Sequence, residues 1–114
     1  MSYECFELEV ANGIAHIRLN RPEKANSMIP SFWTELPAAV NTLSREASAR
    51  VLVISAEGKH FSSGMDISVF TDGGLNSPAG TNPSIGAEAF RHHCMALQSA
   101  FTCLEEARMP VLVA

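Results

Sequence analysis

The sequence lacks a surplus of positive charge and a long apolar run. Eight Lys and Arg residues stand against twelve Asp and Glu residues, which gives a net charge of −4. Nucleic-acid binding needs a basic face that neutralises phosphates, so this balance argues against that function. No stretch reaches the roughly 18–20 apolar residues that cross a bilayer. We therefore expect neither a nucleic acid nor a membrane as partner.

The N-terminus also lacks the pattern of a secretory signal peptide, because Met1–Val10 alternates apolar residues with glutamates. Cysteine is scarce: Cys5, Cys94 and Cys103 are odd in number and widely spaced. Such spacing favours packed free thiols in a reducing compartment over disulfides or a zinc site. We therefore expect a cytoplasmic protein. Its 114 residues, 46% of them hydrophobic, fit one small domain or part of a larger one.

Two short strands joined by a tight turn are predicted at the start of the chain. Tyr3–Val10 alternates apolar and polar residues, and an apolar pattern resumes over Ile14–Leu19. The Asn12-Gly13 pair between them is typical of a two-residue hairpin turn. Pro22 follows soon after and cannot donate a ladder hydrogen bond, so the hairpin should end before it.

From Ser31 the spacing becomes helical, with apolar residues at Phe32, Leu36, Val40 and Leu43. Pro37 interrupts this pattern and predicts a kink or a late helix start. The β-branched run Val51–Ile54 predicts a strand buried on both faces, as in parallel sheets.

The second half of the chain predicts a loop, a helix and a strand. Thr71–Ser84 is rich in Gly and Pro and predicts a long loop, a kind that is often functional. A second amphipathic helix is then predicted by the spacing of Phe90, Cys94, Leu97, Phe101 and Leu104. Val111–Ala114 predicts another buried strand. Strands alternating with helices predict an α/β fold around a mostly parallel sheet, which the strands present are too few to complete.

Two segments carry candidate chemistry. Leu19–Met28 is a turn with two cations, which a solvated surface turn would explain equally well. Val51–Ile67 predicts a buried strand, a loop of small residues and the first turn of a short helix. Free N–H groups at such a helix start can donate to an oxyanion or a polarised carbonyl. A strand, a small-residue loop and a helix also occur together without any binding role.

Together these segments resemble the N-terminal part of the crotonase (enoyl-CoA hydratase/isomerase) superfamily. The first family motif reads here as Asn20-Arg21-Pro22, Lys24 and Asn26. The second is a strand ending in Gly-Lys-x-Phe-small-small-Gly-x-Asp-Ile, which here is Gly58–Ile67. The resemblance covers the whole chain. It implies that residues 1–114 are the N-terminal portion of one crotonase-like domain, a spiral of ββα repeats that is incomplete at Ala114.

The resemblance implies an enzyme of acyl-CoA metabolism, with a backbone oxyanion hole that stabilises a thioester enolate. An enoyl- or dienoyl-CoA substrate and chemistry of the fatty-acid β-oxidation type are expected. The general sequence character of Ser31–Phe61, without a diagnostic motif, is most similar to the dienoyl-CoA isomerase branch. Hydration and other crotonase reactions remain alternative activities. No cofactor is implied, since coenzyme A is part of the substrate. A homotrimer or a dimer of trimers is implied for the complete protein.

The resemblance also implies roles for individual residues. The backbone N–H of Met65 would be the first oxyanion-hole donor. Substrate-binding positions fall on Lys24, Ala25, Ser63, Gly64, Met65, Asp66 and Ile67. Many family members carry Arg where this chain has Ala25, so phosphate contact would fall to Lys24 or Lys59.

The family's second oxyanion donor and its acid/base carboxylates are expected beyond Ala114, so the 1–114 chain alone is expected to be inactive. Glu88, Glu105 and Glu106 fit the polar face of the last predicted helix and are weak substitutes. The alternative hypothesis, from another class, is a catalytically silent fragment or half-structure that binds nucleotide weakly.

No metal site is predicted. His92 and His93 are adjacent, so on a helix their side chains diverge by about 100° and do not form a ligand pair. His60 occupies a variable position of the second motif. Asp66 is expected to cap or brace the predicted short helix, because a carboxylate suits a helix N-terminus.

Overall fold

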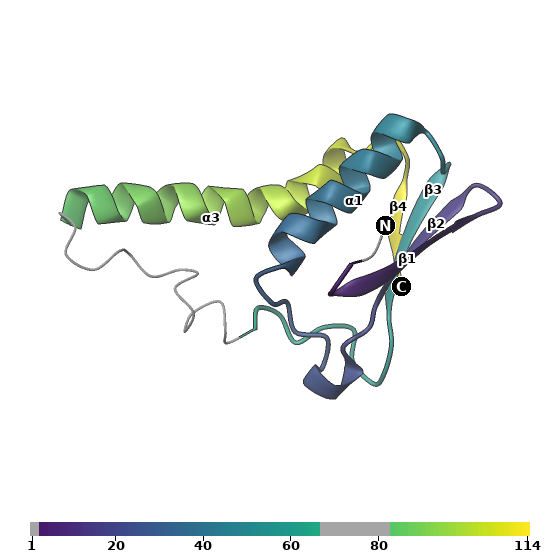
Figure 1. The fold of residues 1–114 in the computed structure, drawn as a ribbon, viewed down its shortest axis with the longest axis horizontal. Helices are drawn as coiled ribbons and strands as arrows, with labels where there is room; N and C mark the ends of the chain where they lie inside the picture. Colours follow the sequence, from purple (N-terminus) through teal and green to yellow (C-terminus); the bar gives the residue numbers. More distant parts are fainter. Residues whose placement is uncertain (1–2, 67–82) are drawn as a thin grey trace.

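The computed structural model describes residues 3–66 and 83–114, which form one four-stranded sheet with two long helices against one face (Figure 1). The strand order is β1-β2-β3-β4. β1 (Phe6–Ala11) pairs antiparallel with β2 (Ile14–Leu19), whereas β3 (Val51–Ala56) and β4 (Val111–Val113) run parallel to β2. The predicted α/β fold with a mostly parallel sheet is confirmed.

The hairpin has the register that its turn residues predict. Phe6 pairs with Leu19 and Ala11 with Ile14, which leaves Asn12 and Gly13 as a two-residue turn. Both turn residues have positive φ, 53° and 79°, as this kind of hairpin turn requires.

Helix α1 (Phe32–Glu46) packs its apolar stripe onto the sheet. Leu36 and Val40 are 2% and 0% exposed. The late start expected at Pro37 is wrong, because the helix begins at Phe32 and runs through the proline. Its first turn is fixed from outside: the Glu35 carboxylate accepts hydrogen bonds from the backbone N–H groups of Glu4 and Cys5 at 3.0–3.1 Å.

The two faces of β3 differ. Leu52 and Ile54 face the helices and are buried, whereas Val51 and Val53 on the other face are half-buried. The prediction of burial on both faces is therefore wrong for the described residues. The outer face also carries a polar pair, in which His16 Nε2 and Ser55 Oγ lie 2.6 Å apart.

Helix α3 (Pro83–Glu106) starts earlier than expected, so the last residues of the predicted loop Thr71–Ser84 are helical. Proline is favoured at the first position of a helix because its missing N–H would have no helical partner there. The remainder of that predicted loop, residues 71–82, lies outside the described residues. The first turns of α3 extend well past α1 and the sheet (Figure 1).

Much of the apolar surface of α3 and β4 is exposed in the part of the chain that the structure describes. Phe90 and Phe101 are 44% and 41% exposed, and burial on α3 is centred instead on Ala100 and Cys103. In β4, Leu112 and Val113 are 57% and 64% exposed. The expected buried strand is thus an open edge among these residues, since nothing described pairs with its far side.

The three cysteines are free thiols, as predicted. Burial raises the pKa of Cys5 to about 11 and also raises that of Cys103. Cys94 is only half-buried. Within residues 3–66 and 83–114, no helix is long and apolar enough to cross a membrane.

Candidate functional site

Two loops meet where β2 and β3 end. Because these strands are parallel neighbours, their carboxyl ends lie at the same edge of the sheet, a frequent location of ligand sites. We call residues 20–28 the first loop and residues 57–66 the second loop. A hydrogen bond connects the two loops where they begin. The N–H of Glu57, the first residue of the second loop, donates to the carbonyl of Leu19, which directly precedes the first loop, at 2.9 Å.

Asn26 locks the two loops together. Its side-chain oxygen accepts from the N–H of Arg21 at 2.8 Å, which closes the first loop on itself. Its amide nitrogen donates to the carbonyls of Glu57 and His60 at 2.8 and 2.9 Å, which holds the second loop against the first. Asn26 is 3% exposed and has a φ of 53°, a conformation that asparagine tolerates better than most residues. The sequence motif contains Asn26, but the pattern alone gave no role for it.

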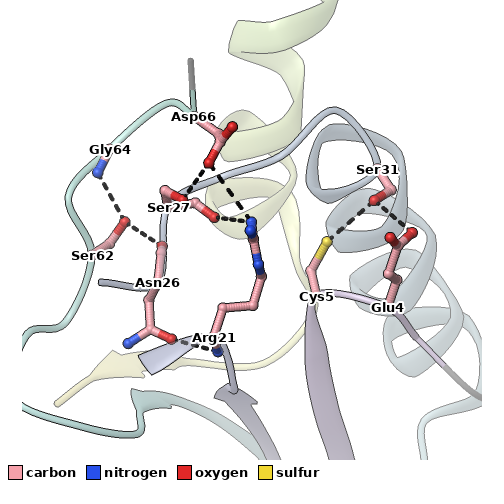
Figure 2. A network of polar contacts seen from close by, with 9 residues as sticks. All are labelled: Glu4, Cys5, Arg21, Asn26, Ser27, Ser31, Ser62, Gly64 and Asp66. Atoms are coloured by element: carbon pink, nitrogen blue, oxygen red, sulfur yellow. Dashed lines mark hydrogen bonds and ion pairs between the residues drawn. The ribbon is translucent and has the colours of Figure 1, made fainter. Parts of the chain in front are cut away.

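Further contacts continue this connection along the second loop. The N–H of Ser63 donates to the carbonyl of Ala25 at 2.9 Å. The hydroxyl of Ser62 donates to the carbonyl of Asn26 at 2.9 Å and accepts from the N–H of Gly64 at 3.1 Å (Figure 2). A Cβ on Gly58 would lie 2.6 Å from the Pro22 side chain, so only glycine allows this approach.

Asp66 ties the end of the second loop to the first. Its carboxylate accepts from the Ser27 hydroxyl at 2.6 Å and lies 3.9 Å from Arg21 Nη1 (Figure 2). The same Arg21 nitrogen donates to the Ser27 carbonyl at 3.0 Å. Asp66 therefore braces the first loop, and Arg21 has partners within the protein. The expectation that Asp66 caps a following helix, like the role of Ile67, concerns residues outside the described part.

Met65 lies in an extended bridge, not in a helical turn as expected. It pairs in parallel with Met28. In this bridge the N–H of Met28 donates to the Gly64 carbonyl at 2.8 Å, and the N–H of Asp66 donates to the Met28 carbonyl at 2.9 Å. The ladder thus uses the groups on either side of Met65, and the N–H of Met65 itself has no acceptor among the described residues. A free backbone donor stands at the place where the resemblance expects one.

A polar hollow of about 570 Å³ opens between the two loops. Its walls are formed by Arg21, Lys24, Ser27, Ser63, Met65 and Asp66. Lys24 is exposed, and no carboxylate among the described residues pairs with it. It is the cation available to an anionic ligand here, since Arg21 is already paired with Asp66.

The other expected binding residues take different places. Ala25 does not line the polar hollow and supplies the carbonyl that holds Ser63. Gly64 has a φ of 94°, and a Cβ there would meet nothing within 4 Å, so its glycine serves the backbone conformation. Lys59 is exposed but does not line the hollow.

An apolar hollow of about 280 Å³ lies beside Met65. Its walls come from α1, α3 and the second loop: Trp33, Met65, Cys94, Leu97, Gln98 and Phe101. The polar and the apolar hollow share Met65. Met65 is therefore the residue at which an elongated molecule with an anionic end and an apolar end would pass from one hollow to the other.

The glutamates of α3 stay on its solvent side. Glu88 pairs with Arg91 at 2.9 Å and with His92 at 3.0 Å, and these partners, Arg91 above all, hold the pKa of Glu88 below its usual range. Glu105 and Glu106 are exposed. None of the three lines the hollows described above, which agrees with their predicted place on a polar face.

Comparison with known proteins decides the family. The profile of a family described as "Enoyl-CoA hydratase/isomerase" matches residues 9–99. The chain belongs to this family. The expected membership of the crotonase superfamily is thereby confirmed, and with it the fold class.

The similar proteins are longer than this chain. A peroxisomal Delta(3,5)-Delta(2,4)-dienoyl-CoA isomerase of Arabidopsis thaliana is 30% identical over 99% of this chain and 42% of its own length. A mitochondrial protein of the same name from Mus musculus is 33% identical over 99% of this chain and 35% of its own. Among solved structures, AtuE of Pseudomonas aeruginosa superposes with a TM-score of 0.78 at 28% identity, covering 96% of this chain and 39% of that one. The chain thus spans about two-fifths or less of these relatives.

Proposed function

We propose that the protein carrying this chain converts an acyl-CoA thioester, with Met65 donating its backbone N–H to the thioester carbonyl. The observation that carries this proposal is the position of that donor. It has no acceptor among the described residues, and it belongs to Met65, which lines both a polar, cationic hollow and an apolar one. A nucleotide-bearing thioester has the matching order of parts: an anionic end, a carbonyl and an apolar chain.

The chemistry follows from that placement. Removal of a proton from the carbon next to a thioester carbonyl moves negative charge onto the carbonyl oxygen. A fixed N–H aimed at this oxygen stabilises the enolate more than the neutral ground state, which lowers the barrier. The bridge to Met28 holds the Met65 peptide in place before the substrate arrives, so the donor needs no reorganisation during the reaction.

The polar hollow would take the nucleotide end of the thioester. Lys24 supplies a positive charge there, and the chain's net charge of −4 makes such a local cation important. Ser63 and Asp66 line the same wall. Asp66 is held by Arg21 and Ser27, so its role in this proposal is to shape the loop and not to move protons.

Within the class, we propose double-bond isomerisation of a dienoyl-CoA as the reaction. The support is similarity over nearly the whole chain to proteins named dienoyl-CoA isomerases. Hydration of an enoyl-CoA is the second candidate, since the family description names both reactions. The proton-transferring carboxylates would come from sequence that follows the described part, as would the second oxyanion donor.

The assembly and the compartment belong to the proposal as well. A homotrimer or dimer of trimers remains a prediction from the resemblance. A cytoplasmic location likewise remains a prediction, and the two isomerases compared above are named as peroxisomal and mitochondrial proteins.

The test uses the longest naturally occurring protein that contains this chain. It is incubated separately with a 3,5-dienoyl-CoA and a 2-enoyl-CoA. Isomerisation leaves the mass unchanged and brings the double bonds into conjugation with the carbonyl, which ultraviolet absorbance detects. Hydration adds the mass of one water. Binding of coenzyme A without conversion of either thioester would contradict the proposal and favour a silent nucleotide-binding protein.

A further inference from the structure

Phe101 separates two apolar hollows. The first is the hollow of about 280 Å³ beside Met65. The second, of about 170 Å³, lies deeper between α1, α3 and the ends of the strands. Of all the residues that line either hollow, Phe101 lines both. Its ring is therefore a partition between them.

The deeper hollow has a uniformly apolar lining. It is lined by Leu19, Met28, Phe32, Leu36, Ile54, Phe61, Phe101, Leu104 and Val113. Met28, the bridge partner of Met65, lines this hollow, so each of the two apolar hollows is lined by one residue of the bridge. A space walled by apolar side chains favours an apolar occupant over water, because water would lose hydrogen bonds there.

Neighbouring rings hold the Phe101 side chain in position. Trp33 contacts it edge-on with ring centroids 5.3 Å apart, and Phe32 lies at 6.2 Å in a tilted arrangement. Phe101 nevertheless remains 41% exposed. It is thus a positioned but incompletely buried ring, and its replacement removes a wall without emptying the centre of the core.

We infer that Phe101 sets the length of acyl chain that the site accepts. This inference rests on the proposed function, because it places the acyl chain of the thioester in the hollow beside Met65. A short chain fits in that first hollow. A longer chain extends toward the deeper hollow and meets the Phe101 ring. Phe101 is therefore a specificity-determining residue that favours short chains.

The test compares variants of the longest natural protein on crotonyl-, octenoyl- and dodecenoyl-CoA, or on a short, a medium and a long 3,5-dienoyl-CoA thioester. In Phe101→Ala the two hollows join, and the ratio of kcat/KM for the longest to the shortest substrate should rise at least about tenfold. Each additional buried methylene of the acyl chain should raise kcat/KM roughly fourfold, so a few methylenes are enough for this change in the ratio. Phe101→Trp enlarges the partition and should move the same ratio the other way.

Phe90→Ala is the matched control. Phe90 is on the same helix, is similarly exposed at 44%, and lines neither hollow, so its replacement should leave the ratio unchanged. Circular dichroism and thermal melting confirm folding, and the opposite shift expected for Phe101→Trp still tests the inference if the Ala variant does not fold. An unchanged ratio in the Phe101 variants, with an active wild type, overturns the inference alone. A wild type that converts no thioester of any length overturns the proposed function and the inference together.

Discussion

The two sides of the site are built in different ways. On the polar side, polar groups of the first and second loops are paired with each other through short hydrogen bonds. Asn26, at the centre of these bonds, is 3% exposed. On the apolar side, Phe101 of α3 lines the hollow and is 41% exposed, and Met95 on the same helix, outside the hollow, is 48% exposed. The polar side is thus set by contacts between two short segments. The apolar side leaves surface that a ligand or further protein can cover.

Helices α1 and α3 show the same contrast between a covered and an uncovered surface. Both carry apolar residues at helical spacing, and both were predicted from it. On α1 this stripe is buried, with Leu36 at 2% exposure, whereas on α3 none of the five predicted residues is fully buried, and Phe90 and Phe101 are exposed. Hydrophobic spacing reports which face of a helix is apolar. It does not report whether another part of the structure covers that face.

The largest expected effect sharpens this comparison of the helices. Leu36→Ala should lower the free energy of unfolding by about 2–5 kcal/mol, because it removes a buried side chain and leaves a cavity. Met95→Ala, at an exposed position of α3, should change it by less than about 0.5 kcal/mol. Urea denaturation of the longest natural protein measures both. Equal losses would break the comparison, since Met95 would then be covered by residues outside the described part.

The polar side is tested by Asn26→Ala. This change leaves the N–H of Arg21 and the carbonyls of Glu57 and His60 without their side-chain partner, which should cost about 2–3 kcal/mol of stability. Asn12→Ala is the matched control: Asn12 has the same φ of 53° but is exposed in the hairpin turn. It should cost about 1 kcal/mol, from backbone conformation alone.

The quantity to measure is the difference between the losses of unfolding free energy in Asn26→Ala and in Asn12→Ala. Denaturant midpoints at constant slope give it directly. Similar losses at the two positions would show that the loops do not depend on the Asn26 hydrogen bonds.

A smaller effect is expected from Lys24→Ala. If Lys24 contacts the anionic end of the thioester, its loss should raise KM about three- to tenfold and change kcat less, as expected for uniform binding. Lys59→Ala is the control, because Lys59 is also exposed but does not line the polar hollow. Steady-state kinetics at low salt separates the two variants. A rise in KM for Lys59→Ala alone would show that Lys59, and not Lys24, contacts the phosphates.

Much of the fold follows from local sequence. Asn12-Gly13 dictates the hairpin and its register, and the spacing from Phe32 to Leu43 dictates α1. Pro37 misled the prediction of the helix start, because burial and the contacts of Glu35 outweigh one missing hydrogen bond. The outer face of β3 was predicted as buried because a β-branched run does not reveal which neighbours cover it.

The site was less predictable. The motif pointed to Met65, but the bridge that leaves its N–H unused is formed with Met28. Met28 lies 37 positions earlier and pairs with Met65 only in three dimensions. The lock formed by Asn26 was missed for the same reason, since its partners Glu57 and His60 come from the second loop. Contacts between distant segments need the fold before they can be assigned.

The measurement that tests the account most directly is the turnover of Met65→Pro against Met65→Ala. Proline removes the N–H, whereas alanine keeps it, and the bridge to Met28 does not use this group. Circular dichroism must show both variants folded, because proline also restricts Gly64 before it. We expect Met65→Ala to keep substantial kcat and Met65→Pro to lose about 10²–10³-fold. A folded Met65→Pro enzyme with near-normal kcat would contradict the role of the Met65 N–H.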